Sequence, residues 1–168
     1  MKVPARVDEI DWPSWQPVDH ATLVFVIRDG RVLLIRKLRG LGAGKINAPG
    51  GRLEPGESHL DCAVRETREE VGVEPLGLAA AGELFFQFLD GYSIQVRVFR
   101  AGGCDGEPCS TDEAIPAWTP LDAIPFDEMW ADDRIWLPHL LAGRPFSGRF
   151  VFDGERMLDF ALALDLED

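Results

Sequence analysis

Apolar runs separated by Asp-Gly pairs dominate the hydrophobic pattern of this chain. Three pairs of runs each flank one Asp-Gly: residues 22–27 and 31–35, residues 84–89 and 92–99, and residues 146–152 and 157–164. Asp-Gly between strand-like runs is the strongest short-range hairpin signal, because both residues tolerate the positive φ of a tight turn. The pattern therefore predicts three β-hairpins.

A helix is predicted over residues 59–71. Ser58 followed by Asp61 is a capping-box start, and Gly72 is a natural left-handed stop. Within this helix, apolar and small residues recur at steps of three and four, which predicts a stripe that packs into a core. The stripe consists of Leu60, Ala63, Val64, Thr67 and Val71.

The order of the elements indicates the fold class. A second helix is predicted from about Asp127 to Leu141, so three hairpins and two helices have to share one core. These elements favour a mixed β-sheet between helices, an α+β protein with an α/β/α sandwich. With 168 residues and 46% hydrophobic content, the chain suits one domain. We assign residues 1–19 to an N-terminal arm and residues 20–168 to the domain.

Charge and composition exclude several classes of function. The net charge of −12 argues against binding of a nucleic acid polymer, which relies on Lys and Arg, but it is compatible with a small, metal-neutralised nucleotide. Residues 1–20 contain no apolar run, so neither a secretion signal nor a membrane span is expected. Cys62, Cys104 and Cys109 lack metal-ligand spacing, and we interpret them as reduced thiols of a cytoplasmic protein.

Three glutamates lie within one turn of the first predicted helix. Glu66, Glu69 and Glu70 fall on one face, because residues three and four apart are neighbours on a helix. Taken alone, such a run is typical of a solvated outer face. Here, however, the preceding loop of residues 47–52 contains two glycines, where the backbone can approach a metal or a phosphate closely. Since Mg²⁺ and Mn²⁺ prefer oxygen ligands and bridge carboxylates to phosphates, the pattern favours a metal site.

Arg65 has two interpretations. Its guanidinium group can fix Glu57 or Glu69 by bidentate pairing, or it can bind a phosphate directly. The first interpretation is favoured, because Arg65 points away from Glu70 in a helix.

Residues 51–73, GRLEPGESHLDCAVRETREEVGV, resemble the Nudix box of the Nudix hydrolases at every defining position. Thr67 is the one unusual residue, where an aliphatic residue is more common. The similarity extends over about residues 20–165 to the MutT-related subfamily of oxidised purine nucleoside triphosphate diphosphatases. Three further stretches carry it: residues 42–47, residues 111–113 and, most specifically, residues 129–136.

This resemblance implies a Nudix fold and a metal-dependent hydrolysis. The expected reaction converts a nucleoside triphosphate to the monophosphate and pyrophosphate, with Mg²⁺ as the cofactor and Mn²⁺ as the alternative. The implied metal ligands are the carbonyl of Gly50 and the carboxylates of Glu66, Glu69, Glu70 and Glu113. Spacing does not decide between Glu66 and Glu70 as the general base, which has to lie near the metal-bound water. Together with these glutamates, Arg65 completes the expected catalytic set.

Base recognition requires an aromatic wall and a few hydrogen-bonding groups in an apolar pocket. Outside the resemblance, Trp130 is typical of a core tryptophan, and Asp132 and Asp133 are typical of a helix cap or a solvated turn. The resemblance instead implies a substrate-binding set of Thr22, Lys37, Asn47, Gly51, Arg52, Phe86, Trp130, Asp132 and Asp133. Burial of two adjacent aspartates should keep one carboxyl protonated, so that the pair reads either an oxo or an amino edge.

Two departures from the subfamily and several rivals limit the substrate. Leu41 stands where the human member has an aromatic residue, and Ala114 stands where a larger apolar residue is usual, so a looser pocket with broader base discrimination is expected. The rivals are a Nudix enzyme for ADP-ribose, nucleotide sugars or dinucleoside polyphosphates, a non-catalytic nucleotide sensor, and an mRNA decapping enzyme. We expect a nucleotide as the partner of a monomer, with a homodimer as the alternative.

Overall fold

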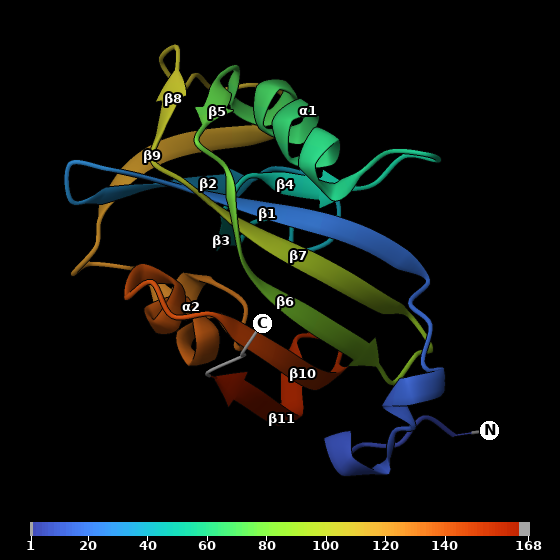
Figure 1. Ribbon diagram of the computed structural model, residues 1–168. Helices are drawn as coiled ribbons and strands as arrows, with labels where there is room; N and C mark the ends of the chain where they lie inside the picture. The colour runs from blue at the N-terminus through green and yellow to red at the C-terminus, as the bar shows by residue number, and fades with distance from the viewer. Residues whose placement is uncertain (1, 165–168) are drawn as a thin grey trace.

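A computed structural model describes residues 2–164 of the chain and shows one large mixed sheet (Figure 1). Within these residues the sheet has nine strands in the order β11-β10-β6-β7-β1-β2-β3, with β4 paired to β1 and β9 paired to β2. The strands of the sheet are β1 (Asp19–Arg28), β2 (Arg31–Lys37), β3 (Ile46–Asn47), β4 (Gly50–Arg52), β6 (Ala79–Phe88), β7 (Ser93–Ala101), β9 (Ala114–Pro120), β10 (Phe146–Asp153) and β11 (Arg156–Leu164). A separate two-stranded sheet pairs β5 (Glu74–Leu76) with β8 (Gly103–Asp105). Residue 1 of the predicted arm and residues 165–168 of the predicted domain lie outside the described residues.

All three predicted hairpins are confirmed. Strands β1 and β2, β6 and β7, and β10 and β11 pair antiparallel across the three Asp-Gly turns. At the first turn Asp29 and Gly30 have φ angles of 53° and 74°, which is the left-handed geometry that this pair tolerates. Parallel pairing of β1 with β7 and of β6 with β10 makes the sheet mixed and joins hairpins that are distant in sequence.

The first helix is confirmed as α1 (His59–Val71). The hydroxyl oxygen of Ser58 accepts a hydrogen bond from the backbone N–H of Asp61 at 3.0 Å, and Gly72 ends the helix at a φ of 73°. Part of the predicted stripe is wrong, because the side chain of Leu60 is 50% exposed. The buried arc of α1 centres on Ala63 and Glu70, and this places Leu60 at its margin in the first turn.

The second helix begins later than predicted. Helix α2 spans Asp133–Leu141, whereas a 3₁₀ turn occupies Phe126–Glu128. Between them Met129 has extended backbone, which interrupts the helix and places its side chain in the core. Trp130 is consequently outside α2. None of the helices within residues 2–164 combines the length and the apolar character needed to cross a membrane.

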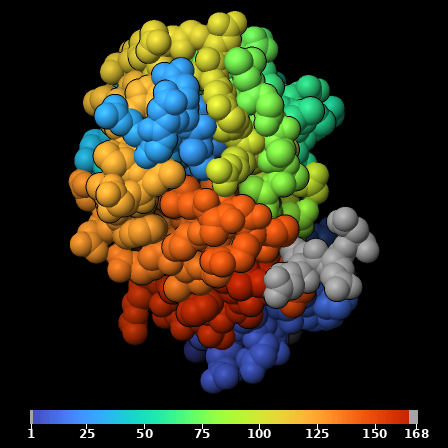
Figure 2. All heavy atoms as spheres, turned by 60° about the vertical axis from the view of Figure 1, so that its left-hand side comes forward, coloured from blue at the N-terminus to red at the C-terminus, as the bar shows by residue number. Residues whose placement is uncertain are grey.

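The two helices cover opposite faces of the sheet. Ala63 and Val71 of α1 belong to one buried cluster, and Trp136 and Leu137 of α2 belong to the other. Figure 2 shows α2 in orange on the surface, between the β1–β2 turn above and the red β10–β11 hairpin below. The observed layers are therefore those of the predicted α/β/α sandwich, and the fold class is confirmed.

The N-terminal segment packs against the β6–β10–β11 part of the sheet. Trp12 and Trp15 contact the ring of Phe85 with centroids 6.4 and 5.8 Å away, and the indole N–H of Trp15 donates to Gln87 at 2.8 Å. Where the arm ends and the domain begins stays a prediction.

Candidate active site

One cavity of about 910 Å³ joins the glycine loop before α1 to the segment before α2. We call the part around Gly50, Gly51 and Glu70 the carboxylate end, and the part around Trp130 and Asp133 the aromatic end. The predicted substrate-binding residues that line this cavity are Thr22, Lys37, Asn47, Gly51, Arg52, Phe86, Trp130, Asp132 and Asp133. The structure therefore brings the whole predicted set to one cavity.

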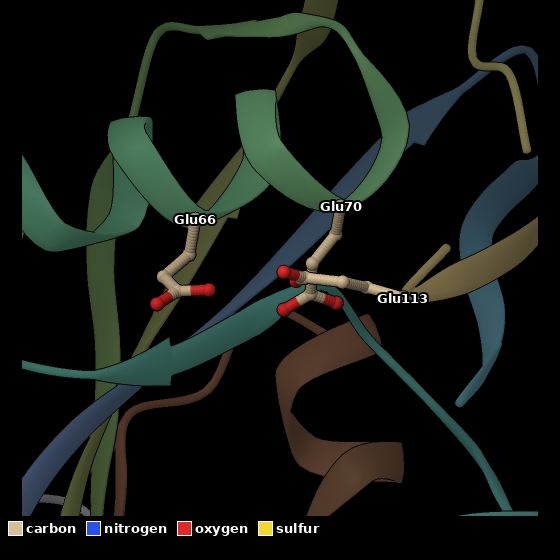
Figure 3. Close-up of side chains that lie close together, drawn as sticks. All are labelled: Glu66, Glu70 and Glu113. Carbon is tan, nitrogen blue, oxygen red and sulfur yellow. The ribbon is translucent and has the colours of Figure 1, made fainter. Parts of the chain in front are cut away.

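Three glutamates converge at the carboxylate end (Figure 3). Glu66 and Glu70 project from successive turns of α1, and Glu113, directly before β9, reaches toward Glu70 from the other side. One carboxylate oxygen from each residue lies within 4.8 Å of one oxygen from each of the other two. Glu113 thus joins a cluster that its position in the sequence, after a polar loop, did not indicate by itself.

Burial and crowding dominate the electrostatics of this cluster. Glu70 is 5% exposed, and its burial, together with the nearby Glu66 and Glu113, raises the pKa of its carboxyl to about 8. The backbone N–H of Gly50 opposes this rise by donating to Glu70 at 3.3 Å, and the charge of Lys37 opposes it as well. Burial also raises the pKa of Glu66.

The residues at the carboxylate end fit a divalent cation. The converging groups are all carboxylates, which are the ligands that hard cations prefer. The backbone leaves room for them only because the loop carries glycines: a Cβ atom on Gly51 would lie 2.3 Å from the carboxyl carbon of Glu66. A Cβ atom on Gly50 would lie 2.0 Å from the carbonyl oxygen of Thr22. Any side chain at either position would therefore displace the strand or the glutamate.

Arg65 ties the loop to the helix. Its guanidinium group donates to both carboxylate oxygens of Glu57, at 2.7 and 2.9 Å, and to Glu66 at 2.9 Å. A fourth hydrogen bond reaches the backbone carbonyl of Arg52 at 3.1 Å. The hydrogen bonds from Arg65 lower the pKa of Glu57 to about 2. This geometry supports the interpretation of Arg65 as the residue that fixes the acidic side chains.

Two predicted residues lie apart from the cluster of three. The carboxylate of Glu69 is half exposed and accepts a hydrogen bond from Arg65 at 3.2 Å. The guanidinium group of Arg52 is largely exposed and pairs with Asp19 at 3.5 Å. Their roles in metal and substrate binding stay predictions. Arg39, which the sequence analysis did not single out, donates to the cluster member Glu113 at 2.7 Å.

Aromatic rings from distant segments meet at the other end. Trp130 packs edge-on against Phe88 and Phe152, with ring centroids 6.3 and 5.7 Å apart. Phe86 lines the cavity and stacks on Phe150 at 5.2 Å. Phe152 was missed in the sequence, because it lies on β10 and only the parallel pairing of β10 with β6 brings it beside Phe88.

Asp132 and Asp133 face the cavity, and each is 3% exposed. The indole N–H of Trp136 donates to Asp132 at 2.7 Å, whereas within residues 2–164 the Oδ2 atom of Asp133 has no hydrogen-bond partner. Burial raises the pKa of Asp132 to about 6, and burial together with the charge of Asp132 raises the pKa of Asp133 well above its usual range. A buried carboxyl oxygen without a partner is costly unless a ligand satisfies it.

The two departures from the subfamily lie in different places. Leu41 lines the cavity and is 53% exposed, and its position against the base stays a prediction. The expectation for Ala114 was wrong, because this residue is buried in the core beneath α1 and does not line the cavity. Its small side chain therefore affects packing of α1 and β9, rather than the width of the pocket.

Comparisons with known proteins show which family the chain belongs to. The family model described as the NUDIX domain matches residues 17–140. The chain is 43% identical to an oxidized purine nucleoside triphosphate hydrolase of Danio rerio, over 82% of this chain and 88% of the relative, and 40% identical to the protein of the same name in Mus musculus, over 84% and 92%. Among solved structures, a mutator MutT protein from Bacillus halodurans superposes with a TM-score of 0.77 at 28% identity, over 86% of this chain and 97% of that chain. The resemblance noted in the sequence is thereby confirmed, and the chain belongs to the Nudix hydrolase family.

Proposed function

We propose that this protein hydrolyses oxidised purine nucleoside triphosphates, such as 8-oxo-dGTP or 2-hydroxy-dATP, to the monophosphate and pyrophosphate. Such a reaction removes damaged nucleotides from the cellular pool. One observation carries the proposal: within residues 2–164 a buried carboxyl oxygen of Asp133 lacks a hydrogen-bond partner beside Trp130, in a cavity whose opposite end includes Glu70 of the three-glutamate cluster. The names of the vertebrate relatives support the same substrate class.

The aromatic end suits a purine base that carries an extra oxygen. Trp130 offers a ring face, and Asp132 and Asp133 offer carboxyl groups in a buried setting where hydrogen bonds are strong. A protonated carboxyl donates to a carbonyl oxygen of the base, whereas an ionised one accepts from an amino or ring N–H. The two aspartates are adjacent and share the pocket. A pair with one protonated and one ionised carboxyl group can therefore recognise a base edge that carries both an acceptor and a donor.

The carboxylate end suits the triphosphate. Members of the Nudix family use divalent metal ions, and we propose Mg²⁺, with Mn²⁺ as the alternative. Glu66, Glu70 and Glu113 would hold the ion, with Glu69 and the carbonyl of Gly50 as the further proposed ligands. When bound, the ion would neutralise phosphate charge and activate a water molecule.

The remaining groups act through their own contacts. Glu66 or Glu70 would accept the proton from the attacking water, because both belong to the cluster that would hold the ion. Arg65 donates hydrogen bonds to Glu57 in the loop and to Glu66 on α1, and thereby positions the loop and a candidate general base. Lys37, whose charge already acts on Glu70, lines the cavity between the two ends and can pair with a phosphate oxygen.

Chromatography of the nucleotide products formed from normal and oxidised nucleoside triphosphates, ADP-ribose, a nucleotide sugar and a dinucleoside polyphosphate tests the proposal. Pyrophosphate is measured in addition for the triphosphates, because ADP-ribose and nucleotide sugars release none. We expect the oxidised purine triphosphates to give the highest kcat/KM, and Glu70→Gln to abolish turnover. Glu74→Gln is the matched control, because Glu74 pairs with Arg68 at 2.7 Å outside the cavity. Preference for ADP-ribose or another diphosphate over every oxidised triphosphate would replace the proposed substrate, and full activity of Glu70→Gln would remove the proposed site.

A further inference from the structure

Lys45 forms an ion pair beside the aromatic end of the cavity. Its ammonium nitrogen lies 3.0 Å from the carboxylate of Glu155 and 5.4 Å from the centroid of the Trp130 ring. Glu155 and Gly154, which form the turn between β10 and β11, line the same cavity as Asp132 and Asp133. The pair therefore connects the loop before β3 to the β10–β11 turn.

The backbone holds Lys45 firmly in this place. Its carbonyl accepts from the N–H of Lys37 at 2.9 Å, and its own N–H donates to the carbonyl of Gly42 at 2.9 Å. Gly42 lies so close to Trp130 that a Cβ atom would be 2.7 Å from the indole nitrogen. The side chain of Lys45 is 24% exposed, whereas that of Glu155 is 68% exposed. Lys45 is therefore a fixed, partly desolvated cation, and Glu155 is its accessible partner.

The charge of Lys45 acts on one of the two buried aspartates, Asp133. It lowers the pKa of Asp133, in opposition to burial and to the charge of Asp132, both of which raise it. The groups that act on Asp133 are Asp132, the backbone of Trp130 and Lys45. The Trp136 indole is bonded to Asp132, and Glu155 is paired with Lys45. Lys45 is the one cation among residues 2–164 that acts on Asp133 in this way.

We propose that Lys45 and Glu155 are specificity-determining residues, because the ammonium group that Glu155 holds beside Trp130 sets how the buried aspartates hydrogen-bond to the base. The proposal rests on the proposed function and names the residues that tune it. A stronger positive charge at Lys45 favours the ionised form of Asp133, which accepts hydrogen bonds, and a weaker charge favours its protonated form, which donates one. Glu155 partly offsets the charge of Lys45, so the two residues act in opposite directions.

The test compares Lys45→Met with Glu155→Gln. For each variant the ratio of kcat/KM for 8-oxo-dGTP to that for 2-hydroxy-dATP is measured between pH 5 and 9. Because both substrates carry the same triphosphate, titration at the carboxylate end cancels in this ratio. We expect the pH midpoint of the ratio to rise by about half to one unit in Lys45→Met and to fall in Glu155→Gln. At pH 7 the ratio itself should change by about three- to tenfold, in opposite directions.

Two controls separate this effect from a structural one. Lys45→Arg keeps the charge and should retain the wild-type midpoint. Glu128→Gln removes the partner of Arg36, an ion pair of 2.8 Å that lies outside the cavity, and should change neither the ratio nor its midpoint. Carboxyl ¹³C NMR of the aspartates gives a readout that does not depend on turnover. Lys45→Met and Glu155→Gln should shift the titration midpoint of one buried carboxyl group in opposite directions.

The outcomes distinguish the two proposals. If the wild type hydrolyses neither oxidised triphosphate, the proposed function fails, and the specificity assignment fails with it. If the wild type hydrolyses both, but Lys45→Met and Glu155→Gln leave the midpoints of the ratio and of the carboxyl signals unmoved, only the assignment of Lys45 and Glu155 is overturned.

Discussion

The two ends of the cavity are built in different ways. Most groups of the carboxylate end come from one continuous stretch, the loop before α1 and α1 itself, and Glu113 is the distant addition. The aromatic end draws on four separate segments: Gly42 in the loop before β3, Phe88 at the end of β6, Trp130 before α2 and Phe152 in β10. In the proposed function, chemistry thus depends on a local unit, whereas recognition of the base depends on the long-range assembly of the sheet. Changes at the first end should alter the rate for every substrate, and changes at the second should alter the choice among substrates.

The largest expected effect is a uniform loss of rate at the carboxylate end. Glu66→Gln should lower kcat by ~100-fold or more for each oxidised triphosphate, because it removes a member of the convergent cluster and a hydrogen-bond acceptor of Arg65. Glu69→Gln is the comparison within the same helix turn, and its effect should be roughly tenfold or smaller, since Glu69 lies outside the cluster. Steady-state kinetics with saturating Mg²⁺ measure both. Equal losses in the two variants would show that the cluster of three does not describe the working ligand set.

A smaller effect, on selectivity, is expected at the aromatic end. Asp133→Asn should change the ratio of kcat/KM between 8-oxo-dGTP and 2-hydroxy-dATP by about tenfold, because a fixed amide can no longer exchange donor for acceptor. Asp132→Asn should also change the ratio, although Trp136 already occupies one oxygen of Asp132. Competition assays with both substrates in one mixture report this ratio directly. The idea that the pair reads two kinds of base edge fails if neither variant alters it.

The contrast between the two ends also explains what the sequence could predict. The hairpins and α1 were predictable because Asp-Gly turns, the Ser58 cap and the Gly72 stop are local signals. Pairing of β6 with β10 joins residues more than sixty positions apart, so no local pattern marked Phe152 as a neighbour of Phe88. The same holds for the contact between Lys45 and Glu155.

Tertiary packing overrode local preference at two further places. The helix expected from Asp127 begins only at Asp133, because Met129 turns into the core. Leu60 matches the helical stripe but lies at the margin of the buried arc, while the acidic Glu70 lies near its centre. A buried glutamate in the place of an apolar residue contradicts binary patterning, and such conflicts are expected at functional sites.

The buried aspartates should also cost stability, and this can be measured through pH. Their pKa values are raised in the folded protein, so the folded state binds more protons than the unfolded state, and stability should fall as pH rises from 3.8 through about 6. Asp133→Asn removes one of these groups and should raise the melting temperature relative to wild type at pH 8, with a smaller gain at pH 5. Calorimetry at both pH values provides the check. A variant that is less stable than wild type at pH 8 would show that Asp133 is satisfied in the folded protein.

The smallest effect on catalysis is expected from the N-terminal arm, although its effect on stability should be measurable. Phe85 and Gln87 contact the arm, whereas Phe86 and Phe88 line the cavity, because successive side chains of a strand point to opposite faces. Trp12→Ala should therefore lower stability by ~1–2 kcal/mol through lost apolar burial.

Both kcat/KM and the substrate ratio of this variant should stay within about twofold of wild type, since the sheet lies between the arm and the cavity. Trp12→Phe, which keeps a ring against Phe85, is the matched control and should recover most of the stability. Chemical denaturation measures the stability of these variants, and steady-state kinetics measure their kcat/KM and substrate ratio. A change in substrate ratio for Trp12→Ala would show that the arm acts on the aromatic end through β6, and recognition would then extend to a fifth segment of the chain.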